Sequence, residues 1–189
     1  MKHLEEKLKN TLTEKRFFHT IRVKDTAVIL SKIYNVSEEE TILAALLHDY
    51  GKHLNYADSL KMIQKFGIIL DDETLNSPEI IHASIAASIA KVDFNINNQD
   101  VLNAITYHTT GRENMSLLEK IIYLADYIEP NRDFPRIDNI RDMAYKDLDK
   151  AVFMAMNNTI NYLIDNNMVI HTNTIKGRNY LLKLHKWRF

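Results

Sequence analysis

The sequence predicts an all-α fold, a helical bundle that forms one domain over residues 1–189. Apolar residues recur at helical spacing along most of the chain, whereas the alternation typical of β-strands is scarce. Only four Gly and three Pro occur in 189 residues, which favours long regular elements joined by few tight turns. With 46% hydrophobic residues the chain can form one substantial core, and it is short for two domains.

Charge and cysteine content exclude several classes of protein. A net charge of −1 gives no electrostatic basis for binding nucleic acid or an anionic membrane. Cysteine is absent, so any metal must be bound through nitrogen and oxygen. The amino-terminal stretch is charged throughout, unlike a signal peptide, and no apolar run approaches the roughly 20 residues that span a bilayer. We expect a soluble, cytoplasmic protein.

The first four helices are expected over residues 2–12, 13–35, 37–52 and 57–67. Thr13 and Ser37 are suited to N-caps, because a hydroxyl oxygen can accept from an N–H of the first helical turn. The acidic run Glu38–Glu40 favours a helix start through its interaction with the helix dipole. Gly67 marks the end of the fourth helix.

The remaining helices are expected over residues 77–91, 97–111, 115–130, 140–167 and 172–187. Ser77 is placed as an N-cap, and Pro78 follows at the first helical position, where its missing N–H is not needed. Gly111 and Pro130 mark two helix ends. Such boundaries are predicted to within about 2–4 residues.

The doublet His48–Asp49 ends the apolar stretch "TILAALL". Successive positions of a helix turn by roughly 100°, so the two side chains share one stripe that faces the interior. Ala44 and Ala45 precede them by one turn and allow a neighbouring helix to approach closely. Burying an unpaired charge costs several kcal/mol, so either a partner residue or a metal ion is required there.

Four further titratable residues fall on apolar helix faces: His19, His82, His108 and Asp126. A single histidine on such a face is more often a hydrogen-bonded core residue than a ligand, and Asp126 alone could cap a helix or pair with Arg132. The set of six residues from five helices favours a metal site between helices. Neutral imidazole and carboxylate suit Fe, Mn, Ni, Co or Zn.

This order of residues resembles the HD-domain superfamily of metal-dependent phosphohydrolases. The resemblance implies an HD-type bundle over nearly the whole chain and a metal held by His19, His48, Asp49 and Asp126. In members with a second metal, two intervening histidines contribute, and these correspond to His82 and His108.

Several short strings are similar to the bacterial YqeK family: "RFFHTIRV", "ALLHDYGK", "IIHASIAA", "ITYHTTG", "YLADYIEPNR" and "IHTNTIKGRNYL". The family cleaves diadenosine tetraphosphate symmetrically to two ADP with iron at its site. The resemblance therefore implies attack of a metal hydroxide on a phosphoanhydride, with iron as the metal and a homodimer as the assembly. Ligand types leave Mn, Co and Ni open, and leave one or two ions open.

Substrate contacts follow from the same resemblance and from charge. Lys52 lies four residues after His48 and can contact phosphate as a point charge, and Arg132 can clamp phosphate oxygens. His48, Asp49 and Lys52 are the expected catalytic residues. The expected substrate-binding residues are Arg16, His48, Asp49, Gly51, Lys52, His82, His108, Thr109, Asp126, Arg132, His171, Thr172, Asn173, Thr174 and Arg178.

The carboxyl-terminal segment, residues 171–189, is expected to close over the nucleotide. Thr172, Asn173 and Thr174 begin a helix and can donate hydrogen bonds to an anion or a ribose, although an ordinary N-cap would look similar. Two alternatives remain from the sequence. One is an HD-type phosphohydrolase acting on deoxynucleotides or guanosine alarmones, and the other is a nucleotide sensor without turnover.

Overall fold

The computed structural model describes residues 2–187. This part of the chain is helical with no strand, so the predicted all-α class is confirmed. The helices are α1 (Lys2–Thr11), α2 (Glu14–Ile33), α3 (Glu38–Leu47), the 3₁₀ helix η1 (Tyr50–His53), α4 (Tyr56–Phe66), α5 (Asp72–Leu75), α6 (Pro78–Asp93), α7 (Gln99–Tyr107), α8 (Leu117–Ile128), α9 (Ile137–Ala144), α10 (Leu148–Asp165) and α11 (Thr172–His185).

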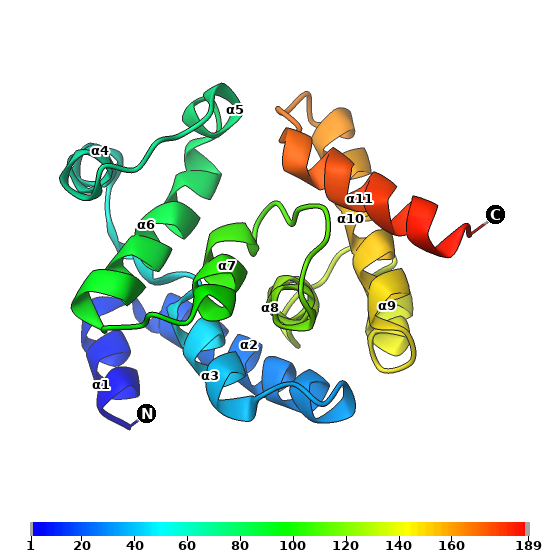
Figure 1. The fold of residues 1–189 in the computed structure, drawn as a ribbon, viewed down its shortest axis with the longest axis horizontal. Helices are drawn as coiled ribbons and strands as arrows, with labels where there is room; N and C mark the ends of the chain where they lie inside the picture. Colours follow the sequence, from blue (N-terminus) through cyan, green and yellow to red (C-terminus); the bar gives the residue numbers. More distant parts are fainter. Residues whose placement is uncertain (1, 188–189) are drawn as a thin grey trace.

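Helix α8 is the centre of the fold. It is seen end-on in the middle of Figure 1, and it packs against α2, α3, α7, α9 and α10. The segment Leu118–Ala125 is buried on every side, as expected for a helix surrounded by others. Ser116 and Glu119 form a capping box that fixes where α8 begins. Asp126, near the end of α8, is therefore held by a helix that is fixed on all sides.

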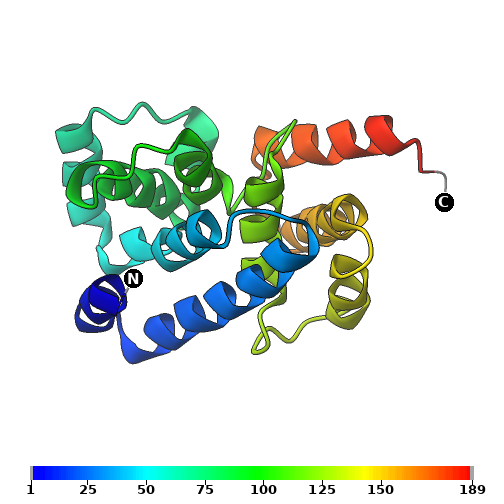
Figure 2. The ribbon, with the colours of Figure 1, turned by 60° about the horizontal axis from the view of Figure 1, so that its bottom comes forward.

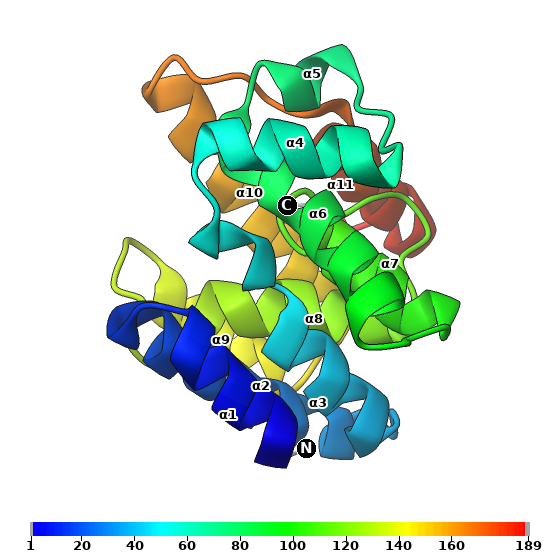
Figure 3. The same ribbon diagram turned by 90° about the vertical axis from the view of Figure 1, so that its left-hand side faces the viewer.

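The helices before α8 in the sequence form its surroundings on one side. In Figure 2, α2 runs beneath α3 and α8, and it packs against both. Helices α6 and α7 pack on each other, and Figure 3 shows α4 lying across α6. On the other side, α10 packs against α8, α9 and α11. Elements far apart in sequence, α2, α6, α7 and α8, thus lie around one interior.

Two predicted helices have different bounds in the structure. The expected helix over residues 140–167 is split into α9 and α10. The break occurs because the side chain of Asp147 caps a new helix by accepting from the N–H of Lys150. Helix α3 ends at Leu47, so His48 is its C-cap and Asp49 has left helical geometry, with φ −98° and ψ 8°. The doublet therefore lies in a turn between α3 and η1, and was wrongly placed within the helix.

The predicted caps are confirmed in part. Ser37 accepts a hydrogen bond from the N–H of Glu40, as expected. Thr13 and Ser77 occupy the N-cap positions, but neither side chain makes a capping hydrogen bond. Gly67 ends α4 in a left-handed conformation with φ 61°. The short helix α5 was not expected, since four residues give too little periodicity to recognise.

Within residues 2–187, none of the helices combines the length and the apolar character needed to cross a membrane.

Candidate metal centre

Six side chains converge beside α8, from α2, the turn after α3, α6, the end of α7 and α8 itself. Nε2 of His19 lies 3.1 Å from Oδ1 of Asp126 and 3.7 Å from Oδ2 of Asp49. The ring of His48 lies edge-on to that of His19, with ring centroids 5.7 Å apart. The predicted ligands His19, His48, Asp49 and Asp126 are therefore neighbours in space.

The two outer histidines belong to the same cluster. Nε2 of His82 lies 3.2 Å from Oδ1 of Asp49, and Nε2 of His108 lies 3.4 Å from the same oxygen. The two Nε2 atoms are 3.2 Å apart. Asp49 is thus approached by imidazoles from several helices, and the structure brings together all six residues that the sequence singled out.

Three of the imidazoles are oriented by the backbone of their own segments. In each of them Nδ1 faces the backbone carbonyl oxygen of the residue three positions earlier. The distance between these two atoms is 2.6 Å for His48, 2.7 Å for His82 and 2.7 Å for His108. A carbonyl can only accept, so each Nδ1 carries the proton and donates it. The proton is then absent from Nε2 of the neutral ring, which leaves a lone pair directed at the cluster. This is the tautomer that a metal ligand needs.

Burial keeps two of these imidazoles, His48 and His82, neutral. Burial lowers the pKa of His48 to about 4 and that of His82 to about 4. Burial by itself would raise the pKa of Asp49, but the facing His48, His108 and His82 and the ammonium of Lys52 together hold it well below its usual value. Near neutral pH His48 and His82 are therefore neutral and Asp49 is ionised. Burial by itself would lower the pKa of His19, but the facing Asp126 and Asp49 raise it.

Two buried ligand atoms have no hydrogen-bond partner among the described residues: Nε2 of His48 and Oδ1 of Asp49. Oδ1 of Asp49 still lies 2.8 Å from the ammonium of Lys52, so the full cost falls on Nε2 of His48. Leaving a buried polar atom unpaired costs about 1–3 kcal/mol, so His48 is expensive in this position unless something binds its Nε2. Ligand atoms of two sets lie within 4.8 Å of one another, His19, His48 and Asp126 in one and His48, Asp49 and His108 in the other. Nitrogen and oxygen donors in this arrangement fit a divalent transition metal.

Two cations neutralise the carboxylates of the cluster. Nζ of Lys52 lies 2.8 Å from Oδ1 and 2.9 Å from Oδ2 of Asp49. Nη2 of Arg132 lies 2.6 Å from Oδ1 of Asp126, and its Nε donates to the backbone carbonyl of Asp126 at 3.0 Å. The pairing of Asp126 with Arg132, left open by the sequence, is present. Asp126 makes this ion pair and at the same time belongs to the cluster.

Open space adjoins the cluster on the side of these cations. A cleft of about 750 Å³ is lined by Arg16, His19, Asp49, Lys52 and Arg132, among others. A smaller cleft of about 360 Å³ continues from it. Arg16 and Lys52 line both, and the second cleft also reaches Gly51 and His82. The predicted substrate residues Arg16, Gly51, Lys52 and Arg132 therefore lie together at the metal centre.

The segment that begins α11 lies in a different pocket. His171, Asn173 and Thr109 line a cavity of about 200 Å³ beside α5, and this cavity shares no lining residue with the cleft over the metal centre. The N–H of Thr172 donates to the carboxylate of Glu73 at 2.7 Å, and its hydroxyl donates to the same carboxylate. The two donors of Thr172, which were expected to face a nucleotide, are therefore already bound to Glu73.

Two other predicted residues also have partners within the protein. The hydroxyl of Thr174 donates to the backbone carbonyl of Thr110 at 2.9 Å. Nε of Arg178 donates to Oδ1 of Asn157 at 2.9 Å, and its guanidinium lies over the ring of Phe153. Arg178 lines none of the cavities described above. In this structure no described residue of α11 lines either of the two clefts at the metal centre. Residues 188–189 of the predicted closing segment lie outside the described residues.

Glu129 is a buried residue of the centre that sequence reasoning missed. Its Oε1 lies 3.2 Å from Nδ1 of His19, and its Oε2 accepts from Nε of Arg22 at 2.6 Å and from the N–H of Asn131 at 2.9 Å. Burial by itself would raise the pKa of this carboxyl, but these hydrogen bonds lower it. The available signal was its position three residues after Asp126, which places both on one helix face.

Comparison with known proteins agrees with this geometry. Residues 16–131 match the HD domain, and the chain belongs to the HD-domain family. That span contains all six residues of the metal centre.

Curated relatives carry a more specific name. The chain is 42% identical over 175 residues to the symmetrical bis(5'-nucleosyl)-tetraphosphatase of Halalkalibacterium halodurans, covering 93% of both chains. It is 37% identical over 177 residues to the protein of that name from Bacillus subtilis, covering 93% of this chain and 94% of the relative. The resemblance predicted from the short motifs is confirmed.

A solved structure has the same fold over nearly the whole chain. It is described as a predicted HD superfamily hydrolase involved in NAD metabolism, from Clostridium acetobutylicum. The TM-score is 0.93 with 44% sequence identity, and the match covers 97% of each chain.

Proposed function

We propose that the protein is a metal-dependent hydrolase that cleaves diadenosine tetraphosphate symmetrically into two ADP. One observation carries this proposal: buried imidazoles and carboxylates, whose ligand atoms lie within 4.8 Å of one another, open into a cleft lined by basic side chains. A polyphosphate is the class of substrate that such charge attracts. The names of the relatives support the particular substrate.

The residues that would hold the metal are His19, His48, Asp49 and Asp126. A bound divalent ion supplies Lewis acidity, which activates water near neutral pH and offsets charge that develops on phosphate oxygens. His82 and His108 would hold a second ion or contact a phosphate. Iron is the metal we propose, because the resemblance to the YqeK family implies it, and metal analysis of protein purified without chelator tests this.

Lys52 and Arg132 would bind the phosphates. Each is now paired with a carboxylate of the cluster, Lys52 with Asp49 and Arg132 with Asp126. With Asp49 and Asp126 engaged as metal ligands, Lys52 and Arg132 would be less strongly held by them and would be available to the phosphates of the substrate. Arg16 has no ion pair among the described residues and lines the same cleft, where it can bind the next phosphate.

The position of cleavage follows from how one half of the substrate is held. We propose that one ADP half lies between the metal centre and the amino-terminal end of α11, with Thr109 and Asn173 toward the nucleoside. Lys52 and Arg132 bind its two phosphates. The attacked phosphorus is then the second from that nucleoside, and the bond broken is the central one. The oxygen of water, with one of its protons, bonds to the attacked phosphorus, and the other proton goes to the bridging oxygen that leaves with the second half, giving two ADP.

Product analysis in ¹⁸O-labelled water tests the proposal. Wild-type protein with Fe²⁺ or Mn²⁺ and diadenosine tetraphosphate should give ADP only, with one labelled oxygen on one ADP of each pair. AMP with ATP would contradict central cleavage. Release of phosphate from deoxynucleotides, or turnover of guanosine alarmones, as the preferred reaction would favour the alternative phosphohydrolase.

A matched pair of variants connects this activity with the cluster. His48→Ala should lose both metal and turnover, since one of four ligands is removed. His53→Ala, an exposed histidine of η1 that bonds the carbonyl of Tyr50, should keep both. Binding of diadenosine tetraphosphate without turnover by the metal-loaded wild type would indicate a sensor.

A further inference from the structure

A second large cavity lies on the other side of Arg132. It has a volume of about 700 Å³ and is formed by the end of α8, the loop that follows it and the carboxyl-terminal half of α10. None of the residues predicted from the sequence lines it except Arg132. Its volume is within the range of about 300–1,000 Å³ that small-molecule sites occupy.

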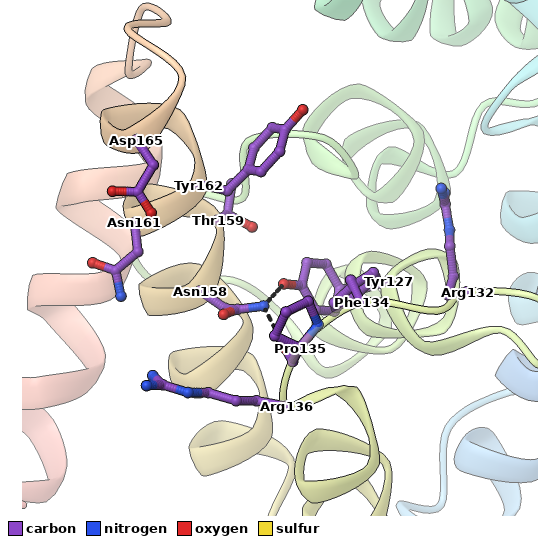
Figure 4. A pocket seen from close by; sticks show the side chains of 10 residues that line it. All are labelled: Tyr127, Arg132, Phe134, Pro135, Arg136, Asn158, Thr159, Asn161, Tyr162 and Asp165. Carbon is purple, nitrogen blue, oxygen red and sulfur yellow. Dashed lines mark hydrogen bonds between the residues drawn. The ribbon is translucent and has the colours of Figure 1, made fainter.

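The walls of this cavity are aromatic. Figure 4 shows Tyr127 and Phe134 at its base, with Tyr162 and Arg132 rising on either side. The rings of Tyr127 and Phe134 meet edge to face, with centroids 4.9 Å apart. Tyr162 is 59% exposed, and its hydroxyl makes no hydrogen bond with the described residues. A flat exposed ring of this kind offers a stacking surface for a planar ligand.

The other lining residues are mostly polar: Arg132, Arg136, Asn158, Thr159, Asn161 and Asp165. Nδ2 of Asn158 donates to the hydroxyl of Tyr127 at 2.9 Å, which fixes the amide (Figure 4). Its Oδ1 accepts no hydrogen bond from the described residues, so it is available to an amino group of a ligand. Thr159 also lines the space. Aromatic surfaces together with fixed polar groups are typical of small-molecule sites that accept a nucleoside.

Arg132 connects this cavity with the metal centre. It lines the cavity and also the cleft of about 750 Å³ that contains His19 and Asp49. Nη2 is bound to Asp126 and Nε to the backbone, which fixes the plane of the guanidinium between the two spaces. A phosphate chain whose first-half phosphates contact Lys52 and Arg132 at the metal centre therefore continues past Arg132 into the cavity.

We propose that this cavity binds the second nucleoside of the dinucleotide, with the base on Tyr162 and the phosphate chain passing Arg132. The inference rests on the proposed function, and it adds the site that a second nucleoside requires. The first half extends from the metal centre toward α11, and the second half extends into this cavity. A substrate with two nucleosides then fills both sites, whereas a mononucleotide leaves one empty.

Two substrates that differ only in the second nucleoside test the proposal. Diadenosine tetraphosphate has a nucleoside at each end, and adenosine 5'-tetraphosphate has the same phosphate chain with one. Tyr162→Ala should raise KM for the dinucleotide roughly tenfold, which is the usual effect of removing a stacking ring. KM for adenosine 5'-tetraphosphate should change less than twofold, about the level of measurement error.

Two further variants make the result specific. Tyr162→Phe keeps the ring and should restore the wild-type KM. Tyr145→Ala removes another exposed tyrosine, which is 47% exposed and lies outside the cavity. It should leave KM unchanged for both substrates. Metal content should equal that of the wild type in every variant, since Tyr162 makes no contact with the cluster.

Unchanged KM in Tyr162→Ala, or an equal rise for both substrates, would overturn the second-nucleoside site. Failure of the proposed function is a separate result, because the wild type itself would then not release ADP from the dinucleotide.

Discussion

His19 and Glu129 are 110 residues apart in the chain, yet Nδ1 of the imidazole lies 3.2 Å from Oε1 of the carboxylate. His19 is the one histidine of the metal centre whose Nδ1 is bound by a side chain instead of a backbone carbonyl. The carboxylate is held in turn by Arg22 at 2.6 Å. Contacts of this kind fix the tautomer and orientation of a ligand and raise its basicity.

Glu129→Gln should therefore weaken metal binding about 10- to 100-fold while the protein remains folded. The amide can still accept from Nδ1, but it lacks the charge that favours the bound ring and that pairs with Arg22. Glu119→Gln is the matched control, because Glu119 is also buried and also pairs with an arginine, Arg112, far from the centre. Equal metal affinity in both variants, measured by titration of the apoprotein, would contradict the role of Glu129.

Glu73→Ala should lower KM for the dinucleotide severalfold. The carboxylate of Glu73 accepts from both the N–H and the hydroxyl of Thr172, and these hydrogen bonds lower its pKa. If the start of α11 binds one half of the substrate, Glu73 competes with the ligand for those donors. Asp72→Ala, next to it and exposed, should leave KM unchanged. A KM that stays the same in Glu73→Ala would place the first nucleoside elsewhere.

Gly51→Ala should weaken the metal centre by displacing the backbone segments that carry its ligands. A Cβ on Gly51 would collide with the carbonyl oxygen of His82, so η1 and α6 would have to separate. We expect a loss of about 1–3 kcal/mol in the free energy of unfolding, with weaker metal binding, because Asp49 and His82 lie on the two segments that move. Denaturant unfolding and metal titration measure the two effects.

Gly67→Ala provides the comparison. No atom lies within 4 Å of a Cβ at that position, and only its left-handed φ of 61° opposes a side chain. A cost of about 1 kcal/mol with unchanged metal affinity is expected. If Gly51→Ala kept wild-type metal affinity, the close approach of η1 and α6 would have no part in forming the site.

Asp149→Asn should destabilise the fold in a pH-dependent manner. Oδ1 of Asp149 lies 2.6 Å from Nζ of the mostly buried Lys120. Burial by itself would raise the pKa of Asp149, but hydrogen bonds from Lys120 and His185 lower it. We expect a loss of about 2 kcal/mol at pH 7, less than for a fully enclosed pair, because water still reaches Asp149.

The sign of the pH dependence follows from the lowered pKa of Asp149. In the unfolded chain the carboxyl titrates near its ordinary value of 3.8, and in the folded protein it titrates below that. Its contribution is therefore complete above about pH 5 and is lost as pH falls through the folded pKa. The difference between wild type and Asp149→Asn should narrow below about pH 4. Asp142→Asn, exposed and unpaired among the described residues, should stay within about 0.5 kcal/mol of wild type at every pH.

Much of the fold was predictable because its signals are local. Periodicity, Ser37, Gly67 and the capping box at the start of α8 each act within a few residues, and the predicted helices there agree with the structure. The break between α9 and α10 was missed because apolar spacing continues through it. A new helix begins there because the side chain of Asp147 accepts a hydrogen bond from the N–H of Lys150.

The sequence by itself determined which residues could form the centre. Histidine and aspartate on apolar faces are costly to bury alone, and that cost made His19, the doublet His48–Asp49 and Asp126 recognisable without coordinates. Tertiary structure alone decided the contacts that depend on packing between distant helices. Glu129 contacts His19, Glu73 occupies the donors of Thr172, and Arg132 lines two cavities, because the packing of several helices brings these segments together. Such distances are set by the packing of whole helices, which no spacing along the chain encodes.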